Sequence, residues 1–279
     1  MKKITIPEKL PKNITYHSEN CERHIFVKNG LEIVKPIQKM MIDGELICPR
    51  CELEKKDLEL QEAIQREYDE LFKRKKYNTF YNWSILSDNT ILAAKLENYQ
   101  VEHQEERENK QTVLESLARF KDGQVFNLIL QGNQGAGKSH LAYAALRELN
   151  ESGLDISCLF VNVESMMRLI RDSFGDKESE YTESYFVELM SEVDYLALDD
   201  IGAETGAIGT DKIATDFVQR VLYAITTTRQ DKSTFITTNL SSETLLRMYD
   251  KKLVSRLFRN PKFVVFKETK DKRMENIPF

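Results

Sequence analysis

A glycine-rich loop directly after an apolar run constrains the fold of this chain more than any other feature. Residues 125–130 read Val-Phe-Asn-Leu-Ile-Leu, and residues 132–139 read Gly-Asn-Gln-Gly-Ala-Gly-Lys-Ser, which is a complete Gly-x-x-x-x-Gly-Lys-Ser loop. Residues 140–149 continue with the apolar spacing of a helix. A buried strand, this loop and a helix that follows it form the phosphate-binding unit of α/β proteins. We therefore predict a P-loop fold.

The residue types of the loop match a nucleoside triphosphate with its metal ion. Glycines let successive backbone N–H groups turn inward around the phosphates, Lys138 reaches the β- and γ-phosphates, and the Ser139 hydroxyl ligates Mg²⁺. The positive end of the following helix faces the same phosphates. The predicted cofactors are therefore ATP or GTP, together with Mg²⁺. The predicted nucleotide-binding residues are Gly132, Asn133, Gln134, Gly135, Ala136, Gly137, Lys138, Ser139 and His140.

Composition limits the class of protein. The chain has 279 residues, enough for one full domain and a smaller one. Hydrophobic residues make up 41% and charged residues 30%, which indicates a soluble globular protein rather than a disordered one. No run approaches the roughly 18 apolar residues of a membrane span, and the amino-terminal residues lack the apolar segment of a secretory signal. We expect no membrane partner, a cytoplasmic location and reduced cysteines. The net charge of −5 argues against a protein that coats nucleic acid.

Three regions of the chain differ in composition. Residues 1–51 are rich in Pro, Asn, Gly and β-branched residues, which indicates a small module of strands and turns. Residues 52–76 carry one apolar helical stripe, so we predict a connecting helix there. Residues 77–88 have no clear period and form the predicted linker, whose aromatic side chains we interpret as packing contacts. We thus divide the chain into a module with its helix, 1–76, the linker, and a large domain, 89–279.

Predicted strands and helices alternate in the large domain. The expected helices are residues 89–120, 140–149, 165–174, 182–192 and 212–229. The expected strands are residues 125–130, 157–163, 195–198 and 233–238. This alternation predicts an α/β fold, with a parallel sheet that has helices on both faces.

Two acidic residues end the predicted strand at 195–198. Asp199 and Asp200 fit a Walker B site, where a carboxylate at the carboxyl end of a strand holds hydrated Mg²⁺. We assign Asp199 to the metal, together with Ser139. Asp200 takes the position where many ATPases of this class carry Glu to orient the attacking water. Because Asp is one methylene shorter than Glu, we predict slow intrinsic hydrolysis.

A polar residue also follows the predicted strand 233–238. The side-chain amide of Asn239 fits the sensor 1 role, in which it points at the γ-phosphate or the lytic water. The alternative is that Asn239 only caps the next helix, a common use of Asn. With Lys138 and Asp200, it belongs to the predicted catalytic set.

Arg256 completes the predicted catalytic set. It ends a predicted helix and is suited to reach the nucleotide of a neighbouring subunit as an arginine finger. Arg229 and Arg259 are weaker candidates for such a contact, and for both we expect surface salt bridges.

The amino-terminal module holds two pairs of metal-ligand residues. Cys21 and His24 form one pair, Cys48 and Cys51 form the other, and 23 residues separate the pairs. Three thiolates and one imidazole suit a single tetrahedral Zn²⁺, and in a reducing compartment metal binding is the better use of such spacing. We therefore predict Zn²⁺ at these four residues. Cys158 lies within an apolar strand and is expected in the core.

Four sequence strings together resemble one protein family. They are the phosphate loop at 132–139, Asp-Asp-Ile-Gly-Ala-Glu at 199–204, Thr-Thr-Asn-Leu at 237–240 and Ser-Arg-Leu at 255–257. Spread over residues 89–268, the set is similar to the DnaC/DnaI family of bacterial and phage replicative helicase loaders, which are AAA+ ATPases. The resemblance implies an AAA+ fold and ATP-controlled delivery of a hexameric replicative helicase onto single-stranded DNA during replication initiation. It also implies a homo-oligomer when ATP or the helicase is bound.

The resemblance carries expectations for both ends of the chain. Several loaders have a zinc-binding amino-terminal domain that touches the helicase, which supports residues 1–76 as the helicase contact. The chain ends soon after Arg256, so we expect a reduced helical lid without a sensor 2 arginine.

Other functions stay open from the sequence. An IstB-like ATPase that assists a transposase is built on nearly the same ATPase core. A nucleotide-gated adaptor with negligible turnover is a further possibility, because Asp200 replaces the usual Glu. A small-molecule kinase fits less well, because Asn239 and Arg256 suit hydrolysis in an assembly.

Single-stranded DNA is a predicted partner without a clear binding site. The stretch 173–183 contains Lys177, which could meet phosphate, and the aromatic residues Phe174 and Tyr181, which could stack on bases. The same stretch is rich in acidic residues, so a solvated loop is the alternative.

Overall fold

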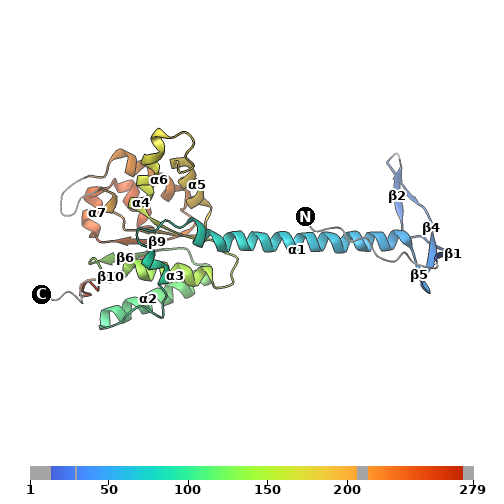
Figure 1. Ribbon diagram of the computed structural model, residues 1–279, viewed down its shortest axis with the longest axis horizontal. Helices are drawn as coiled ribbons and strands as arrows, with labels where there is room; N and C mark the ends of the chain where they lie inside the picture. The colour runs from blue at the N-terminus through green and yellow to red at the C-terminus, as the bar shows by residue number, and fades with distance from the viewer. Residues whose placement is uncertain (1–13, 29, 206–212, 273–279) are drawn as a thin grey trace. The chain divides into compact units, whose positions relative to one another are not determined.

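The computed structural model describes residues 14–28, 30–205 and 213–272 (Figure 1). Contacts divide the chain into two compact units, residues 1–72 and 73–279. The first unit contains a small β-module, and the second contains the α/β domain. Within the described part of the chain, no helix is both long and apolar enough to cross a bilayer.

The first unit has short antiparallel strands followed by a long helix. Its elements are β1 (Ile14–Cys21), β2 (Ile25–Lys28), β3 (Leu31–Val34), β4 (Ile37–Ile42), β5 (Glu45–Ile47) and the start of α1 (Pro49–Trp83). Strands β1, β4 and β5 form one sheet in that order, and β2 pairs with β3. Among the described side chains of this unit, the buried ones are Cys21, His24 and Cys48. Strands and turns are therefore present in the described part of the predicted module, 14–28 and 30–51, and no described apolar side chain there other than the cysteines is buried.

Helix α1 extends beyond the predicted connecting helix at both ends. The prediction covers 52–76, whereas α1 starts at Pro49, a residue suited to the first helical turn, and continues to Trp83. The prediction of an irregular linker is therefore wrong for the last turns of this helix. Tertiary contact sustains them, because Phe80 is buried and its ring centroid lies 4.9 Å from that of Tyr143.

The second unit is built on one parallel sheet. Its strands are β6 (Asn127–Gly132), β7 (Cys158–Asn162), β8 (Tyr195–Asp199), β9 (Ser233–Thr238) and β10 (Pro261–Phe266). They lie in the order β10-β6-β9-β8-β7. The α-helices are α2 (Gln104–Lys121), α3 (Lys138–Asn150), α4 (Val163–Asp172), α5 (Glu183–Glu192), α6 (Asp216–Thr228), α7 (Ser242–Met248) and α8 (Lys251–Leu257). The short 3₁₀ helices are η1 (Asn89–Ala93), η2 (Ser173–Gly175) and η3 (Ala203–Thr205).

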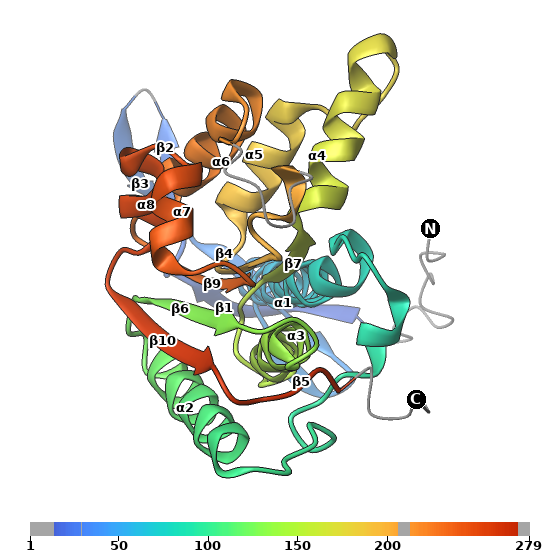
Figure 2. The same cartoon turned by 90° about the vertical axis from the view of Figure 1, so that its left-hand side faces the viewer.

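Helices cover both faces of this sheet (Figure 2). On one face α2 and α3 pack over Leu128 and Leu130, and on the other α4, α5 and α6 pack over Ile129 and Ile236. Neighbouring residues of a strand point to opposite faces, so a strand that is buried on both sides must be apolar throughout. This explains the apolar runs in the sequence, and it confirms the predicted α/β fold.

Some predicted elements differ from those observed. The predicted helix 89–120 is divided into η1 and α2, because the Asn98 side chain both accepts and donates 2.8 Å backbone hydrogen bonds that close a turn after η1. The predicted helix 212–229 begins at Asp216, where Thr215 caps it, and residue 212 lies outside the described residues. No sequence pattern predicted β10, which joins the sheet by pairing with β6.

Candidate functional site

The carboxyl ends of three adjacent strands meet at one edge of the large sheet. Strand β6 leads into the phosphate loop, β8 ends at Asp199, and β9, which lies between them, leads to Asn239. A cavity of about 440 Å³ lies at this edge. The predicted site residues that line it are Gln134, Gly135, Gly137, Lys138, Ser139, His140, Asp199, Asp200 and Asn239. The sheet thus brings distant segments of the chain onto one cavity. The other predicted loop residues, Gly132, Asn133 and Ala136, do not line it.

Gly137 sets the shape of the phosphate loop. Its φ is 87°, in the left-handed region, and it is the N-cap residue of α3. A Cβ atom at this position would lie 2.7 Å from the Tyr99 ring, so any side chain here would meet both backbone strain and a collision. The Lys138 ammonium donates to the carbonyl oxygens of Gly132 (2.9 Å) and Asn133 (2.6 Å). The lysine is therefore held inside the curve of the loop.

Asp199 is a buried acid held by neutral side chains. It is 3% exposed, and its carboxylate accepts hydrogen bonds from the Thr237 hydroxyl (2.7 Å) and the Asn162 amide (3.4 Å). The same Thr237 oxygen accepts a hydrogen bond from the backbone N–H of Asp200 at 2.8 Å. Oxygen ligands of this kind suit Mg²⁺, and the Ser139 hydroxyl lines the same cavity. The residues present therefore fit a magnesium ion.

Asp200 and Asn239 form a side-chain pair in the cavity. The Asn239 amide donates a 2.9 Å hydrogen bond to Oδ1 of Asp200. The cap of α7 is a different residue, Ser241, whose hydroxyl accepts from the backbone N–H of Thr244 at 3.1 Å. The alternative role of Asn239 as a helix cap is therefore wrong. The pair places a carboxylate and an amide next to the phosphate loop.

The structure adds cavity and site residues that sequence reasoning missed. Asn162 is the last residue of β7 and Thr237 the last but one of β9, so a search for polar residues at the carboxyl ends of strands could have found them. Tyr99 and Lys272 come from segments without regular structure, and no sequence signal marks them. Both line the cavity, where the Lys272 ammonium lies 4.6 Å from the Tyr99 ring centroid and 3.0 Å from a Glu106 carboxylate oxygen.

The segment after β10 covers part of the phosphate loop. The backbone N–H of Lys272 donates to the Gly135 carbonyl at 3.2 Å, and the Asp271 carboxyl group lies against the Cα atom of Gly135. Glu105 anchors this segment by accepting from the backbone N–H (2.9 Å) and hydroxyl (2.6 Å) of Thr269. Residues 267–272, the described ones after β10, form no lid helix.

His140 lies beside the same cavity. Its Nε2 atom is 3.0 Å from the Lys95 carbonyl oxygen, and its ring centroid is 5.7 Å from that of Tyr99. Burial lowers the pKa of the His140 imidazole below its ordinary value. The ring is therefore neutral at neutral pH, which suits contact with a nucleotide base or sugar more than with a phosphate.

Arg256 does not line this cavity. Its neighbour Leu257 accepts a 3.0 Å hydrogen bond at its carbonyl from the side chain of Asn127, the first residue of β6. The phosphate loop follows the opposite end of the same strand, so Arg256 and the loop lie at opposite ends of β6. The Arg256 guanidinium carbon lies 4.3 Å from the Tyr223 ring centroid, and Nη1 donates to the Lys252 carbonyl at 3.0 Å. Its Nε is buried and has no hydrogen-bond partner among the described residues. A residue that acts on a neighbouring subunit requires such a distant position, but the finger role stays a prediction.

Arg229 is a buried structural residue, so neither the surface salt bridge nor the finger role predicted for it is correct. It is 4% exposed, and its guanidinium donates to the carbonyl oxygens of Met190 (2.6 Å), Val193 (2.7 Å) and Ser233 (2.9 Å). Burial lowers its pKa to about 10, which still leaves it charged at neutral pH. Arg259 is exposed, and no described carboxylate forms the expected ion pair with it.

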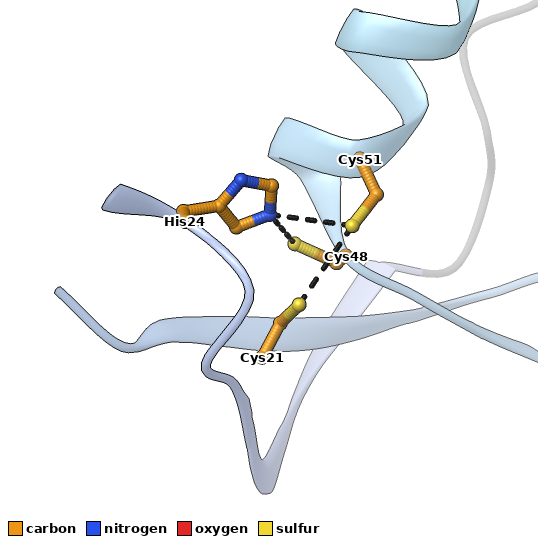
Figure 3. A group of neighbouring side chains, drawn as sticks. All are labelled: Cys21, His24, Cys48 and Cys51. Atoms are coloured by element: carbon orange, nitrogen blue, oxygen red, sulfur yellow. Dashed lines mark hydrogen bonds between the residues drawn. The ribbon is translucent and has the colours of Figure 1, made fainter. Parts of the chain in front are cut away.

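The predicted zinc ligands converge at the start of α1 (Figure 3). The ligand atoms of Cys21, His24, Cys48 and Cys51 all lie within 4.8 Å of one another. The Sγ atoms of Cys21 and Cys51 are 3.7 Å apart, and His24 Nε2 is 3.3 Å from Cys48 Sγ and 3.2 Å from Cys51 Sγ. Around tetrahedral Zn²⁺, with Zn–S about 2.3 Å and Zn–N about 2.1 Å, ligand atoms lie about 3.6–3.8 Å apart. The donor set and its spacing therefore fit one zinc ion.

Two charged side chains contact this cluster. Glu54 Oε1 lies 3.3 Å from His24 Nδ1, which leaves Nε2 of the ring facing the thiols. The Arg23 guanidinium donates to Cys51 Sγ at 2.9 Å. A hydrogen bond from the backbone of Arg23 is the main cause that lowers the pKa of the Cys21 thiol to about 6. The surroundings of Cys21 therefore favour the thiolate form that binds metal, whereas burial raises the pKa of the Cys51 thiol. Cys158, in contrast, is fully buried in β7, as predicted.

The loop after α4, a predicted DNA contact, packs its aromatic rings within its own unit. Phe174 is 67% exposed and makes an edge contact with Phe217, and the Tyr181 ring stacks on Phe186. Lys177 is exposed. The stacking contact accounts for Tyr181 without DNA, whereas the Phe174 ring stays largely exposed, so the DNA contact stays a prediction.

Solved structures of DNA replication proteins share the fold of the second unit. The crystal structure of the DnaC helicase loader superposes with a TM-score of 0.52 at 21% identity, covering 64% of this chain and 100% of that chain. DnaI gives a TM-score of 0.52 at 22% identity, covering 65% of this chain and 95% of that chain. DnaA from Aquifex aeolicus gives a TM-score of 0.51 at 22% identity, covering 65% of this chain and 52% of that chain. These similarities confirm the predicted fold, a parallel sheet with helices on both faces.

Sequence comparison finds replicative helicase loaders among curated proteins. The replicative helicase loader DnaC of Escherichia coli K12 is 27% identical over 171 residues, which is 61% of this chain and 65% of DnaC. DnaC from Buchnera aphidicola of Schizaphis graminum is 27% identical over 161 residues, covering 58% of this chain and 61% of that protein. The chain thus spans a little less than two-thirds of the curated relatives that it matches.

The family comparison covers more of the chain. Residues 60–258, well over half of the 279, match the family described as IstB-like ATP binding protein. The matched range contains the phosphate loop, Asp199, Asp200, Asn239 and Arg256. On the strength of this match and of the cavity built from the loop and the two acids, the chain belongs to the IstB-like family of ATP-binding proteins.

Proposed function

We propose that this protein is an ATP-dependent loader that delivers a hexameric replicative DNA helicase onto single-stranded DNA. The observation that carries the proposal is the single cavity onto which the phosphate loop, Asp199 and the Asp200–Asn239 pair converge. The similarity to DnaC supports a replicative helicase as the partner. In this proposal residues 1–76, with their zinc site, contact the helicase.

In the proposed reaction each cavity residue has a distinct role. The loop amides and Lys138 hold the phosphates of ATP, while Ser139 and Asp199 provide oxygen ligands for Mg²⁺. The magnesium ion, when bound, offsets the negative charge that develops on the γ-phosphate. Asp200 orients the attacking water, and Asn239 holds the Asp200 carboxylate through its 2.9 Å hydrogen bond.

The proposed ATPase is slow without its partners. Asp200 reaches one methylene less far than the Glu that is common at this position, so the attacking water is held less well. Arg256 of a neighbouring subunit would supply positive charge to the γ-phosphate. Because Arg256 lies away from its own cavity, full activity requires a homo-oligomer.

A loading assay tests this function. The purified protein is mixed with a hexameric replicative helicase, ATP and circular single-stranded DNA, and helicase retained on the DNA is measured. We expect loading with the wild type, none with Lys138→Ala, and normal loading with the control Lys262→Ala, which changes an exposed lysine of β10. Equal helicase retention with and without the wild-type protein would refute the proposal.

Mixing two inactive variants tests the role of Arg256 separately. Lys138→Ala lacks the loop lysine but keeps the arginine, and Arg256→Ala keeps the loop. If the arginine acts across an interface, the mixture recovers part of the ATPase activity that neither variant has alone. A mixture as inactive as its components would contradict the proposal for Arg256.

Two further candidates each rest on an observation. The matching family description favours an IstB-like helper of a transposase. The short Asp200 side chain favours a nucleotide-gated adaptor with negligible turnover. Capture of a transposase instead of a helicase from host lysate would support the first candidate, and the absence of multiple-turnover phosphate release, with and without single-stranded DNA, would support the second.

A further inference from the structure

The turn that presents Asp200 has a conformation that needs support. Asp200 has a φ of 59°, and Gly202, two residues on, has a φ of 107°. A Cβ atom at Gly202 would lie 2.4 Å from a methyl carbon of Leu240, so the turn packs closely against the segment after β9. Backbone in the left-handed region is costly for a residue such as Asp and persists only where surrounding contacts hold it.

Glu204 provides such a contact. It lies in η3, is 7% exposed, and its Oε2 accepts a 2.8 Å hydrogen bond from the backbone N–H of Gly202. Its Oε1 accepts a hydrogen bond from the Tyr249 hydroxyl. Burial raises the pKa of the Glu204 carboxyl group. A buried carboxyl group is unfavourable unless hydrogen bonds satisfy it, and here both oxygens are used.

Tyr249 connects the turn to the helix that carries Arg256. It is 3% exposed and follows α7, and the next residue, Asp250, caps α8 by accepting from the backbone N–H of Lys252 at 2.7 Å. The hydrogen bond from Tyr249 to Glu204 therefore joins the turn after β8 to the start of α8. Neither Tyr249 nor Glu204 lines the nucleotide cavity.

We propose that Glu204 and Tyr249 are a positioning pair for ATP hydrolysis. They fix the turn after β8 so that Asp200 faces the phosphate loop, and they touch neither nucleotide nor metal. This inference rests on the proposed ATPase function. Because the pair acts on Asp200 and not on the loop residues that hold the phosphates, its loss should impair the hydrolytic step and leave ATP binding intact.

The substitution Tyr249→Phe removes one hydroxyl group and tests the pair. The matched control is Tyr195→Phe, which removes a hydroxyl group that donates a 2.9 Å hydrogen bond to the Phe120 carbonyl, at the opposite end of β8 from Asp199. Steady-state ATPase assays give kcat and KM, calorimetry gives the Kd of MgATP, and thermal unfolding reports on stability. Because small displacements of a positioned group can reduce rates by about 10–100-fold, we expect a loss of kcat in that range for Tyr249→Phe. The Kd of MgATP should stay within about twofold of the wild type, because the pair does not contact the nucleotide and its loss affects only the chemical step.

A second variant separates positioning from loss of folding. Glu204→Gln keeps an oxygen that can accept from Gly202, so it should fold and retain more of kcat than Glu204→Ala does. Equal kcat values for Tyr249→Phe and Tyr195→Phe would overturn the inference, and so would a rise of Kd in parallel with the loss of rate. Wild-type protein that neither binds nor hydrolyses ATP would overturn the proposed function itself, and this inference with it.

Discussion

Removal of zinc is expected to unfold the amino-terminal module while the second unit, which contains the nucleotide cavity, stays folded. Among the described side chains of residues 14–72, the buried ones are Cys21, His24 and Cys48, which are all proposed ligands. The other described apolar residues of the module are either exposed, as Ile14 (50%) and Leu31 (70%) are, or only half-buried, as Ile37 and Ile47 are. The module therefore has little apolar burial of its own to hold it together.

The magnitude follows from this lack of a core. A fully buried aliphatic side chain contributes about 1.5–3 kcal/mol, and the described part of the module buries none. Binding of a structural Zn²⁺ in zinc-finger peptides contributes about 10–16 kcal/mol at pH 7, and much of this is folding free energy. The second unit buries extensive apolar clusters on both sheet faces, so its folding should not depend on this metal. Chelation thus removes the dominant stabilising contribution from the module alone.

NMR spectroscopy and limited proteolysis measure the outcome after treatment with a high-affinity zinc chelator. We expect one zinc per chain before treatment, and afterwards collapse of the amide resonances of residues 14–48, rapid cleavage there and unchanged MgATP affinity. Cys48→Ser should reproduce the effect, and His17→Ala, a histidine of β1 outside the cluster, should not. Dispersed module resonances in protein proven to be metal-free would refute the reasoning.

Three further predictions follow from contacts of single side chains. Glu54→Gln should weaken zinc binding about 10–100-fold in chelator competition, because the carboxylate orients His24, whereas unchanged affinity would exclude that role. Arg229→Met should lower the free energy of unfolding by about 3–5 kcal/mol in denaturant titrations, because it leaves buried carbonyl groups without a hydrogen-bond donor. The control Arg259→Met, at an exposed arginine, should leave the free energy of unfolding unchanged, and equal stabilities of the two variants would contradict this account. Asp200→Asn should reduce ATP turnover by about 100-fold or more while MgATP binding persists, and undiminished phosphate release would remove Asp200 from the mechanism.

The predictable part of the fold came from residues with strong local patterns. Strands β6 to β9 are apolar because both sheet faces are covered, so their positions were visible as apolar runs. The phosphate loop and the paired cysteines were equally visible, because the chemistry of each depends on residues that are close in the chain. Helix α1 was predicted in its exposed part and missed where Phe80 packs against Tyr143, because that contact is invisible in the local pattern.

Other residues depend on contacts between distant segments. Arginine is a charged residue type that is usually exposed, yet Arg229 is buried because carbonyl groups from two other segments surround its guanidinium. Asn239 had two open roles until its amide was found beside Asp200 and not at the start of α7. Tyr99 lines the cavity only because its loop folds over Gly137.

The sequence by itself determined the parts whose chemistry is local: a loop for phosphate, acids at a strand end and a four-ligand set for zinc. Only the tertiary structure decided which distant residues share one environment. It placed Thr237 between Asp199 and Asp200, joined Glu204 to Tyr249, and set Arg256 away from its own loop. The reason is physical, since short-range patterns reflect backbone conformation and burial, whereas contacts between segments depend on how whole elements pack.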